Sequence, residues 1–405
     1  MASHPTRDRL NLLDGAWYAD DPHEIWTWMR REAPVYHDEA SDVWGIARYD
    51  DVLAIEKDAA TFSSRRAPRP HGHALPMMIS MDNPEHQRRR SLVSRGFTPR
   101  RVAQYEETVE RLCASILDAV CEDGACDFVW DVAARLPLLL IADLLGFEPE
   151  LHDDLLEWSD DLIRATDANM TDEVATRGAN AMMAFRECQL QVIAQRRASP
   201  RDDLISTLCQ ATIDGEVLDD ESILNETLLI LIGGDETTRH VITCGMLALL
   251  ERPDQARLLA DEERLPIAVE ELLRWVSPVK NMARTATRDV EVRGQVIHEG
   301  DQLILFYPSA NRDEDVFQAA DRLDVTREPN PHLAFGFGPH FCLGASLARL
   351  ELKVMFREVL RRLPDLRLAS DDPLPHRHSN FITGPEAMPV EFTPTARSGG
   401  AGSVT

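Results

Sequence analysis

Basic residues are scarce in this chain of 405 residues. Its 43 Lys and Arg face 69 Asp and Glu, which gives a formal net charge of −26. Nucleic acids and anionic membrane surfaces attract proteins through stripes of Lys and Arg, which carry the opposite charge. The acidic balance therefore argues against both kinds of partner.

Long hydrophobic runs, a secretory signal and paired cysteines are missing as well. The best apolar run, Leu136 to Leu145, is interrupted by Asp143 and falls short of the roughly 18 residues that a membrane helix needs. Residues 1–13 contain charged side chains and no apolar stretch, so they predict no secretory signal. The seven cysteines include no CxxC pair, which fits free thiols in a reducing compartment. We expect a cytoplasmic protein.

Helical periodicity dominates what the chain does contain. Hydrophobic residues, 44% of the total, recur at intervals of three and four, which predicts amphipathic helices. Short runs bounded by glycine predict a few strands. We expect a mainly helical fold with small β-sheets, with one domain over residues 1–395 and a disordered tail over 396–405. Helices are expected at 105–120, 151–164, 176–197 and 222–251, and strands at 43–48 and in a small meander over 290–306.

The segment 222–251 is the most unusual of these. Acidic residues precede it, which is favourable at a helix N-terminus, and Pro253 follows it. Its first half is hydrophobic on every side, and then GGDETT over 233–238 places glycines and polar residues in a buried helix. Each glycine costs roughly 1 kcal/mol relative to Ala, and buried carboxylates need partners. Two interpretations stay open: a kink with acids that reach solvent, or a widened turn that makes room for a ligand.

A glycine-rich loop, FGFGPHFCLG over residues 335–344, runs directly into another predicted helix. Gly336 and Gly338 permit a tight turn with exposed backbone. Cys342 then stands at the N-terminus of the helix, where backbone N–H groups favour the thiolate, which is a good metal ligand. Taken alone, a buried cysteine is more often a small hydrophobic residue than a ligand.

Two shorter patterns carry little information by themselves. Glu271 and Arg274 lie three residues apart on a predicted helix, where they can form an ion pair as many surface residues do. His86 and Arg90, four residues apart in HQRRR, share a helix face that is also typical of a solvated basic surface. Their order relative to the other two patterns makes them informative.

Together the four patterns resemble the cytochrome P450 superfamily of haem-thiolate monooxygenases. They occur in the order H-x-x-x-R, G-G-x-E-T, E-x-x-R and F-x-x-G-x-H-x-C-x-G, and they span nearly the whole chain. The cysteine loop is a highly specific motif. The resemblance implies the cytochrome P450 fold, in which a long central helix crosses the haem and the cysteine loop precedes a helix.

By this resemblance the cofactor is haem b, and Cys342 would be the thiolate ligand of its iron. His86, Arg90, Arg284 and His340 would hold the haem propionates, because charged hydrogen-bond donors suit carboxylates. The other residues expected at the haem are Phe335, Gly344 and Gly233.

The resemblance also implies an acid–alcohol pair in the long helix. Thr237 would hydrogen-bond dioxygen and an ordered water, while Glu236 would relay protons. The adjacent Asp235 remains the alternative proton shuttle. Gly233 and Gly234 would let the helix bulge over the haem so that oxygen fits.

A structural charge network is expected around Glu271 and Arg274. In the family its third member is an arginine that follows a Pro-Glu motif, but this chain reads ADRL over residues 320–323. We expect Arg322 to complete the network, with Arg327 as the alternative.

Electrons are expected from separate proteins, since no flavin or iron–sulfur segment is fused to the haem segment. The resemblance implies a ferredoxin and an NAD(P)H-dependent ferredoxin reductase. An arginine cluster in an otherwise acidic chain supports docking of an acidic partner, although some of these side chains could serve haem propionates or internal acids. The cluster comprises Arg88, Arg89, Arg90, Arg95, Arg100 and Arg101.

The substrate is expected to be a hydrophobic small molecule. LILIGGDETTRH, ALPMMISMDNPEH, SPVKNMAR and HLAFGFGPHFCLG resemble actinobacterial enzymes that oxidise the terminal methyl of a sterol side chain, with cholesterol and cholest-4-en-3-one as substrates. The alternative is a biosynthetic hydroxylase of a polyketide, macrocycle or terpenoid. A non-catalytic haem-binding sensor is a remote alternative, because it would not need the acid–alcohol pair. Candidate pocket residues are Met77, Met78, Ile79, Ile230, Gly234, Val279, Asn281, Phe381 and Ile382.

Overall fold

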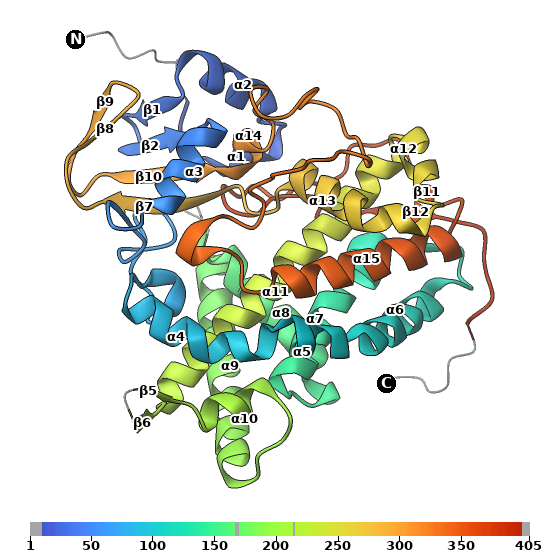
Figure 1. The fold of residues 1–405 in the computed structure, drawn as a ribbon. Helices are drawn as coiled ribbons and strands as arrows, with labels where there is room; N and C mark the ends of the chain where they lie inside the picture. Colours follow the sequence, from blue (N-terminus) through green and yellow to red (C-terminus); the bar gives the residue numbers. More distant parts are fainter. Residues whose placement is uncertain (1–9, 167–169, 214, 399–405) are drawn as a thin grey trace.

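Helices account for most of the described chain, and the expected mainly helical class is confirmed (Figure 1). The computed structural model describes residues 10–166, 170–213 and 215–398. Its helices are α1 (Gly15–Ala19), α2 (His23–Glu32), α3 (Tyr49–Lys57), α4 (Glu85–Val93), α5 (Pro99–Gln104), α6 (Glu106–Val120), α7 (Arg135–Leu145), α8 (His152–Arg164), α9 (Asp172–Ala198), α10 (Leu204–Cys209), α11 (Asp220–Leu250), α12 (Pro253–Leu258), α13 (Leu265–Val276), α14 (Tyr307–Ala310) and α15 (Ala345–Arg362).

The long helix predicted over 222–251 is α11, and it runs through the interior of the molecule (Figure 1). The carboxylate of Asp219 caps its first turn by accepting a hydrogen bond from the backbone N–H of Ser222 at 2.6 Å. Its 31 residues make a rod of about 45 Å at about 1.5 Å per residue. Because α7, α8, α13 and α15 pack around it, many of its polar side chains, among them Asp235, Glu236 and Arg239, are buried and need partners within the protein.

Helices α11 and α15 approach each other closely at Gly245. A Cβ atom on Gly245 would lie 2.8 Å from the ring of Phe356, so a larger residue there would force the helices apart. The cysteine loop precedes α15, which begins at Ala345. The contact therefore helps to fix the distance between that loop and α11.

A five-stranded sheet packs with α1, α2 and α3 at one end of the molecule (Figure 1). β2 and β10 are parallel, and the other neighbours are antiparallel. The sheet contains, in spatial order, β1 (Val35–Asp38), β2 (Val43–Ile46), β10 (Gln302–Phe306), β7 (Asn281–Ala286) and β3 (Phe62–Ser63). Smaller sheets pair β5 (Thr212–Ile213) with β6 (Glu216–Val217), β8 (Val290–Val292) with β9 (Gln295–Ile297), and join β11 (Arg367–Leu368), β12 (Pro389–Glu391) and β4 (Ala125–Asp127).

The meander expected over 290–306 was partly wrong. β8 and β9 form the expected hairpin, but β10 leaves it and pairs with β2 and β7. β10 is buried along its whole length, so its hydrophobic residues are accommodated inside the large sheet and not in an exposed hairpin.

Three residues of the expected tail, 396–398, are among the described residues. Arg397 forms an ion pair with Glu122 at 3.1 Å, and the backbone N–H of Ser398 donates to Asp118 at 2.9 Å. These contacts lie at the end of α6 and just after it, and the rest of the expected tail, 399–405, lies outside the described residues. Among the described helices, none is long and apolar enough to cross a membrane.

Candidate active site

The loop before α15 has a conformation that requires its glycines. Gly336 and Gly338 have φ angles of 66° and 69°, in the left-handed region that other residues avoid. A Cβ atom on Gly338 would also lie 2.4 Å from the backbone carbonyl of Glu56. The backbone N–H of Cys342 donates to the carbonyl of Phe335 at 2.9 Å, which closes the loop beside the start of α15.

The thiol of Cys342 has two opposed influences on its charge. Burial raises its pKa, while the backbone amides of Gly344 and Ala345 and the charges of Arg90 and Arg349 lower it. The amides at the start of the helix favour the thiolate as expected, but burial outweighs them. A bound metal ion reverses this balance, because a thiol that coordinates a metal is deprotonated.

Four expected propionate-binding residues gather near this loop. The ring centroids of His86 on α4 and His340 lie 4.1 Å apart. Burial, together with the charges of Arg284 on β7, His86 and Arg90, lowers the pKa of His340 to about 3. Arg284 also pairs with Glu56 at 2.7 Å. The cluster therefore concentrates cationic side chains, and anionic groups such as the two propionates of a haem would stabilise it.

Gly233 and Thr237 share the face of α11 that remains open. No described atom lies within 4 Å of the position that a Cβ on Gly233 would take. Thr237 is half-buried, and its hydroxyl donates to the carbonyl of Gly233 at 2.8 Å. The expectation of a widened turn was wrong, because α11 is a continuous α-helix from Asp220 to Leu250. The absence of a side chain at Gly233 leaves the space for a ligand instead.

Gly234 serves a different purpose from its neighbour. A Cβ atom on Gly234 would lie 2.7 Å from the side chain of Ile141 on α7. Its expected place in a substrate pocket is therefore corrected: the missing side chain lets α7 pack against α11.

Glu236 lies on another face of α11 and is completely buried. Arg239 and Arg377 form ion pairs with it, the latter at 2.5 Å, and His240 lies 3.1 Å from its Oε1. Burial raises the pKa of Glu236, but these three neighbours outweigh burial and hold the pKa well below its ordinary range. The carboxylate is therefore charged at neutral pH.

Asp235 has the opposite environment. It is fully buried, and neither of its oxygens makes a well-formed hydrogen bond with a described residue. Burial raises its pKa to about 7, although the charge of Arg239 lowers it. The pKa values of two adjacent carboxyl groups are thus shifted in opposite directions, down for Glu236 and up for Asp235.

The expected charge network around Glu271 contains a different third arginine. Arg274 donates twice to Glu271 at 2.7 Å, and the Nε of Arg327 donates to it at 3.0 Å. The side chain of Arg322 is exposed, and only its backbone carbonyl takes part, accepting from Arg274 at 2.9 Å. The expectation of Arg322 was wrong because the chain turns there, and Arg327 returns to the carboxylate.

The candidate substrate residues divide into two groups. Met77, Met78, Ile79 and Ile230 belong to one hydrophobic cluster, with Ile79 partly exposed. The second group comprises Val279 and Asn281, just before and at the start of β7, and Phe381 and Ile382 in the segment near residue 380. Val279 and Ile382 form a β-bridge, and the ring of Phe381 lies 4.3 Å from the guanidinium of Arg69.

Asn281 is a further correction. It is completely buried, and its side chain contacts Arg69 at 2.8 Å, the backbone carbonyl of Asn380 at 2.7 Å and the hydroxyl of Tyr18 at 3.2 Å. These contacts occupy its amide, so Asn281 ties β7 to other parts of the chain.

Sequence reasoning missed the partners of Glu236. Arg239 and His240 lie three and four residues after it, a spacing that places them beside it on a helix, and this signal was available. Asp160 on α8 and Arg377 lie far from it in sequence, and no local pattern marks them. Asp160 accepts from Arg377 at 2.7 Å and from Arg239 at 3.1 Å.

Several known proteins are similar to this chain over most of its length. Residues 160–391 match the family model described as Cytochrome P450. The chain is 47% identical over 398 residues to a protein of Mycolicibacterium smegmatis named Steroid C26-monooxygenase, covering 98% of this chain and 99% of that one. It is 48% identical over 389 residues to a protein of that name from Mycobacterium tuberculosis, covering 95% and 98%. The structure of P450BioI with an acyl carrier protein ligated to hexadec-9Z-enoic acid has a TM-score of 0.87 at 32% identity, covering 93% and 99%.

The chain therefore belongs to the cytochrome P450 family. It is a monooxygenase with haem b as its cofactor. The residues present fit that group, because the basic cluster needs anions and because no described atom lies within 4 Å of a Cβ placed on Gly344 or Gly233. A flat macrocycle needs such unfilled space on the cysteine side and on the α11 side.

The Glu271 network yields a paired prediction. Replacing Arg327 by Gln should lower the free energy of unfolding by about 2 kcal/mol, because a buried carboxylate loses a charged hydrogen-bond donor. Replacing Arg322 by Gln should change it by less than about 0.5 kcal/mol, because the backbone carbonyl remains. Chemical denaturation of both holoenzymes measures the difference. Equal losses would contradict the assignment of Arg327.

Proposed function

We propose that this protein hydroxylates the terminal methyl group of a steroid side chain, with cholesterol or cholest-4-en-3-one as substrate. The observation that carries the proposal is the identity of nearly half over almost the whole length to proteins named Steroid C26-monooxygenase. The site supports it, because its hydrophobic candidates are flexible and aliphatic and suit a long hydrocarbon.

Cys342 is the residue we assign to the haem iron. It stands in a loop with enforced backbone geometry, next to the cluster of His86, Arg90, Arg284 and His340 that we assign to the propionates. When bound, the haem activates dioxygen for insertion into a C–H bond. The protein holds the cofactor in place from both its thiolate side and its propionate edge.

Thr237 and Glu236 are the residues we assign to oxygen activation. The hydroxyl of Thr237 lies on the open face of α11 and can exchange its bond to Gly233 for one to dioxygen or water. Glu236 is ionised and can accept a proton, whereas the pKa of Asp235 is raised by burial and neither of its oxygens has a hydrogen-bond partner among the described residues. We therefore assign the proton relay to Glu236.

We infer that a ferredoxin, reduced by an NAD(P)H-dependent reductase, supplies the electrons. Phe337 and Phe341 of the cysteine loop expose 40% and 39% of their surface. Arg95, which follows α4, and Arg100, in the first turn of α5, are also exposed. Exposed basic side chains in a protein of charge −26 suit a transient acidic partner. Arg89 and Arg101 contribute less, because they pair with Glu226 and Asp202.

A spectral titration tests the substrate. Addition of cholest-4-en-3-one to the ferric holoenzyme should convert low-spin to high-spin haem, because the steroid displaces water from the iron. The apparent affinity should exceed that for a fatty acid or a macrolide by at least about tenfold, or about 1.4 kcal/mol. Reconstitution with ferredoxin, reductase and NAD(P)H should then yield the terminal alcohol. A shift with the macrolide alone would direct the search to biosynthetic substrates.

Substitution of Cys342 by Ser tests the metal ligand. The reduced carbon-monoxide complex should lose its red-shifted Soret band, because that band requires a thiolate opposite the carbon monoxide. Cys188→Ser on α9 is the control and should keep the band. Retention of the band in Cys342→Ser would overturn the assignment.

Substitution of Thr237 by Ala tests oxygen activation. The variant should still consume NAD(P)H, but the product formed per NAD(P)H should fall by about tenfold or more and hydrogen peroxide should accumulate. The reason is that the hydroxyl proposed to direct protons to oxygen is lost. Thr238→Ala, at the adjacent buried position, should remain coupled to product formation. Tight coupling in Thr237→Ala would remove the hydroxyl from the mechanism.

A further inference from the structure

Glu226 is a second buried carboxylate on α11, and the reaction steps assigned above do not use it. Its side chain is 0% exposed. Because an α-helix turns by about 100° per residue, Glu226 lies within about 20° of arc of both Gly233 and Thr237. It therefore belongs to the same face of α11 as the open site, about 10 Å along the helix axis from Gly233.

The segment 77–81 covers this face of α11 at Glu226. Both carboxylate oxygens of Glu226 accept from the backbone N–H of Met78, at 3.1 and 3.4 Å. Met78 begins the short 3₁₀ helix η1 (Met78–Ser80), and Met77 and Met78 are each 6% exposed. The face of α11 that is open at Gly233 is thus closed by this segment at Glu226.

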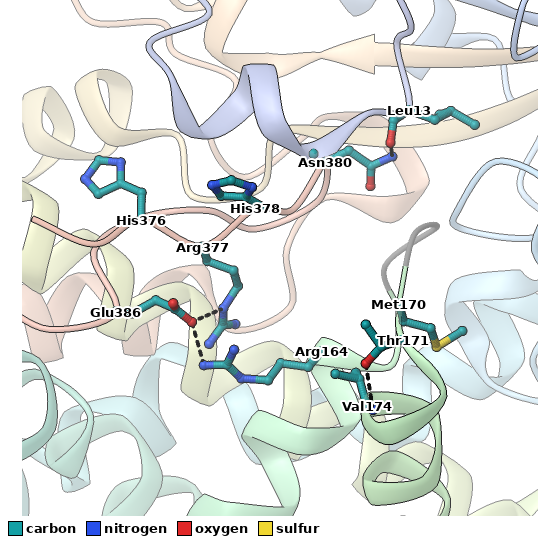
Figure 2. Close-up of a pocket in the computed structure, with 11 residues that line it drawn as sticks. Leu13, Arg164, Met170, Thr171, Val174, His376, Arg377, His378, Asn380 and Glu386 are labelled. Atoms are coloured by element: carbon teal, nitrogen blue, oxygen red, sulfur yellow. Dashed lines mark hydrogen bonds and ion pairs between the residues drawn. The ribbon is translucent and has the colours of Figure 1, made fainter.

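Arg89 on α4 supplies a compensating charge without occupying the carboxylate. Its Nε lies 3.7 Å from Oε1 of Glu226, which is too far for a hydrogen bond, and its buried Nη1 has no hydrogen-bond partner among the described residues. Figure 2 shows a closer arrangement at the surface pocket of about 380 Å³ beside α8, where Arg164 pairs with Glu386 at 2.8 Å. The oxygens of Glu226 therefore remain available to the backbone of Met78.

Stability alone does not account for a carboxylate at this position. Burial raises the pKa of Glu226 to about 7, although the charge of Arg89 and the N–H of Met78 lower it. When hydrophobic residues of similar volume replace a buried ion pair, the change is often neutral or stabilising. The specific contribution of Glu226 is its attachment of the segment 77–81 to α11.

The proposed reaction needs a fixed wall around the end of the substrate. The terminal methyl of a sterol side chain is bonded to a tertiary carbon, whose C–H bond is weaker than those of the methyl. Because intrinsic reactivity favours the tertiary carbon, selectivity for the methyl requires that only the end of the side chain reach the oxygen. Met77 and Met78 share a hydrophobic cluster with Ile230, which lies one turn after Glu226 on α11.

We propose that Glu226 is a positioning residue that holds the segment 77–81 against α11 and thereby selects the terminal methyl over the adjacent tertiary carbon. This deepens the proposed function and rests on it. The bond to the backbone of Met78 fixes where the side chains of Met77 and Met78 lie, so the cavity stays too narrow for the tertiary carbon to reach the oxygen. Glu226 acts through these two side chains.

Substitution of Glu226 by Leu in the holoenzyme tests the selectivity. Reconstituted with ferredoxin, reductase, NAD(P)H and cholest-4-en-3-one, the unsubstituted enzyme should form mainly the terminal alcohol. In Glu226→Leu the ratio of tertiary to terminal alcohol should rise by about fivefold or more, because the wall is no longer fixed. Both alcohols form by RH + O₂ + 2 e⁻ + 2 H⁺ → ROH + H₂O, so only the C–H bond that breaks differs between them. Mass spectrometry of the separated products measures the ratio.

Hydrogen exchange gives a measurement that does not depend on the substrate. In the ferric holoenzyme without steroid, amide exchange over residues 77–81 should be about tenfold faster in Glu226→Leu, because the N–H of Met78 loses its acceptor. Exchange within α13, which lies away from this contact in the chain, should stay the same.

Glu226→Gln is the conservative variant. It keeps an oxygen that can accept from the N–H of Met78 and removes the charge. It should restore at least about half of the selectivity that Glu226→Leu loses, because the hydrogen bond and not the charge holds the segment.

Thr227→Val is the matched control on the next residue of α11. Thr227 is equally buried, and its hydroxyl donates to the carbonyl of Ile223 at 2.7 Å and contacts the amide of Gln189 on α9. Loss of these bonds should lower the free energy of unfolding without a change in the product ratio or in exchange over residues 77–81.

The outcomes separate this proposal from the one on which it rests. Unchanged exchange over residues 77–81 in Glu226→Leu would overturn the positioning role, whichever substrate the enzyme takes. Faster exchange with an unchanged product ratio would show that the segment does not select the methyl. If the unsubstituted enzyme forms no steroid alcohol while exchange in Glu226→Leu is faster, the proposed function fails and the attachment of the segment stands. Equal changes in Thr227→Val and Glu226→Leu would reveal a general effect of destabilisation and would contradict the role of Glu226.

Discussion

The charge of Glu236 in the middle of α11 is the constraint on which the distal half of the molecule depends. A carboxylate without solvent contact is unfavourable unless cations surround it, and here the cations come from α11 itself and from the segment near residue 377. Asp160 on α8 shares those cations, so the same interactions join α8, α11 and the C-terminal segment. The carboxylate of Glu236 thereby helps to hold three parts of the fold together.

The cysteine loop forms the opposite side of the site. Backbone geometry fixes its conformation, whereas charge does not. The left-handed glycines and the close approach of Gly338 to Glu56 leave the cysteine loop one conformation. The Glu271 network ties α13 to the segment that leads into that loop through Arg274, Arg327 and Asn330. The two candidate sides of the site are thus a rigid loop and a helix whose buried charges are paired with residues of other segments.

The contrast between Arg322 and Arg327 shows where sequence reasoning reaches its limit. Both arginines lie in the same segment, and a motif that departs from the family pattern cannot tell which one turns inward. The choice depends on a turn at residues 319–322 and on hydrogen bonds to carbonyls of that turn. The two glycines of α11 show the same limit, because identical residues face open space at Gly233 and a packed isoleucine at Gly234.

The sequence by itself determined the class of fold, the positions of the long helices and the glycine-rich loop before α15. These depend on periodicity and on short motifs, which are local properties of the chain. Only the tertiary structure decided that β10 joins the large sheet, that Asn281 is occupied by internal hydrogen bonds, and that Arg377 reaches Glu236 across 141 residues of chain. Such contacts arise from how distant segments pack, and buried charges take whichever partner packing brings near.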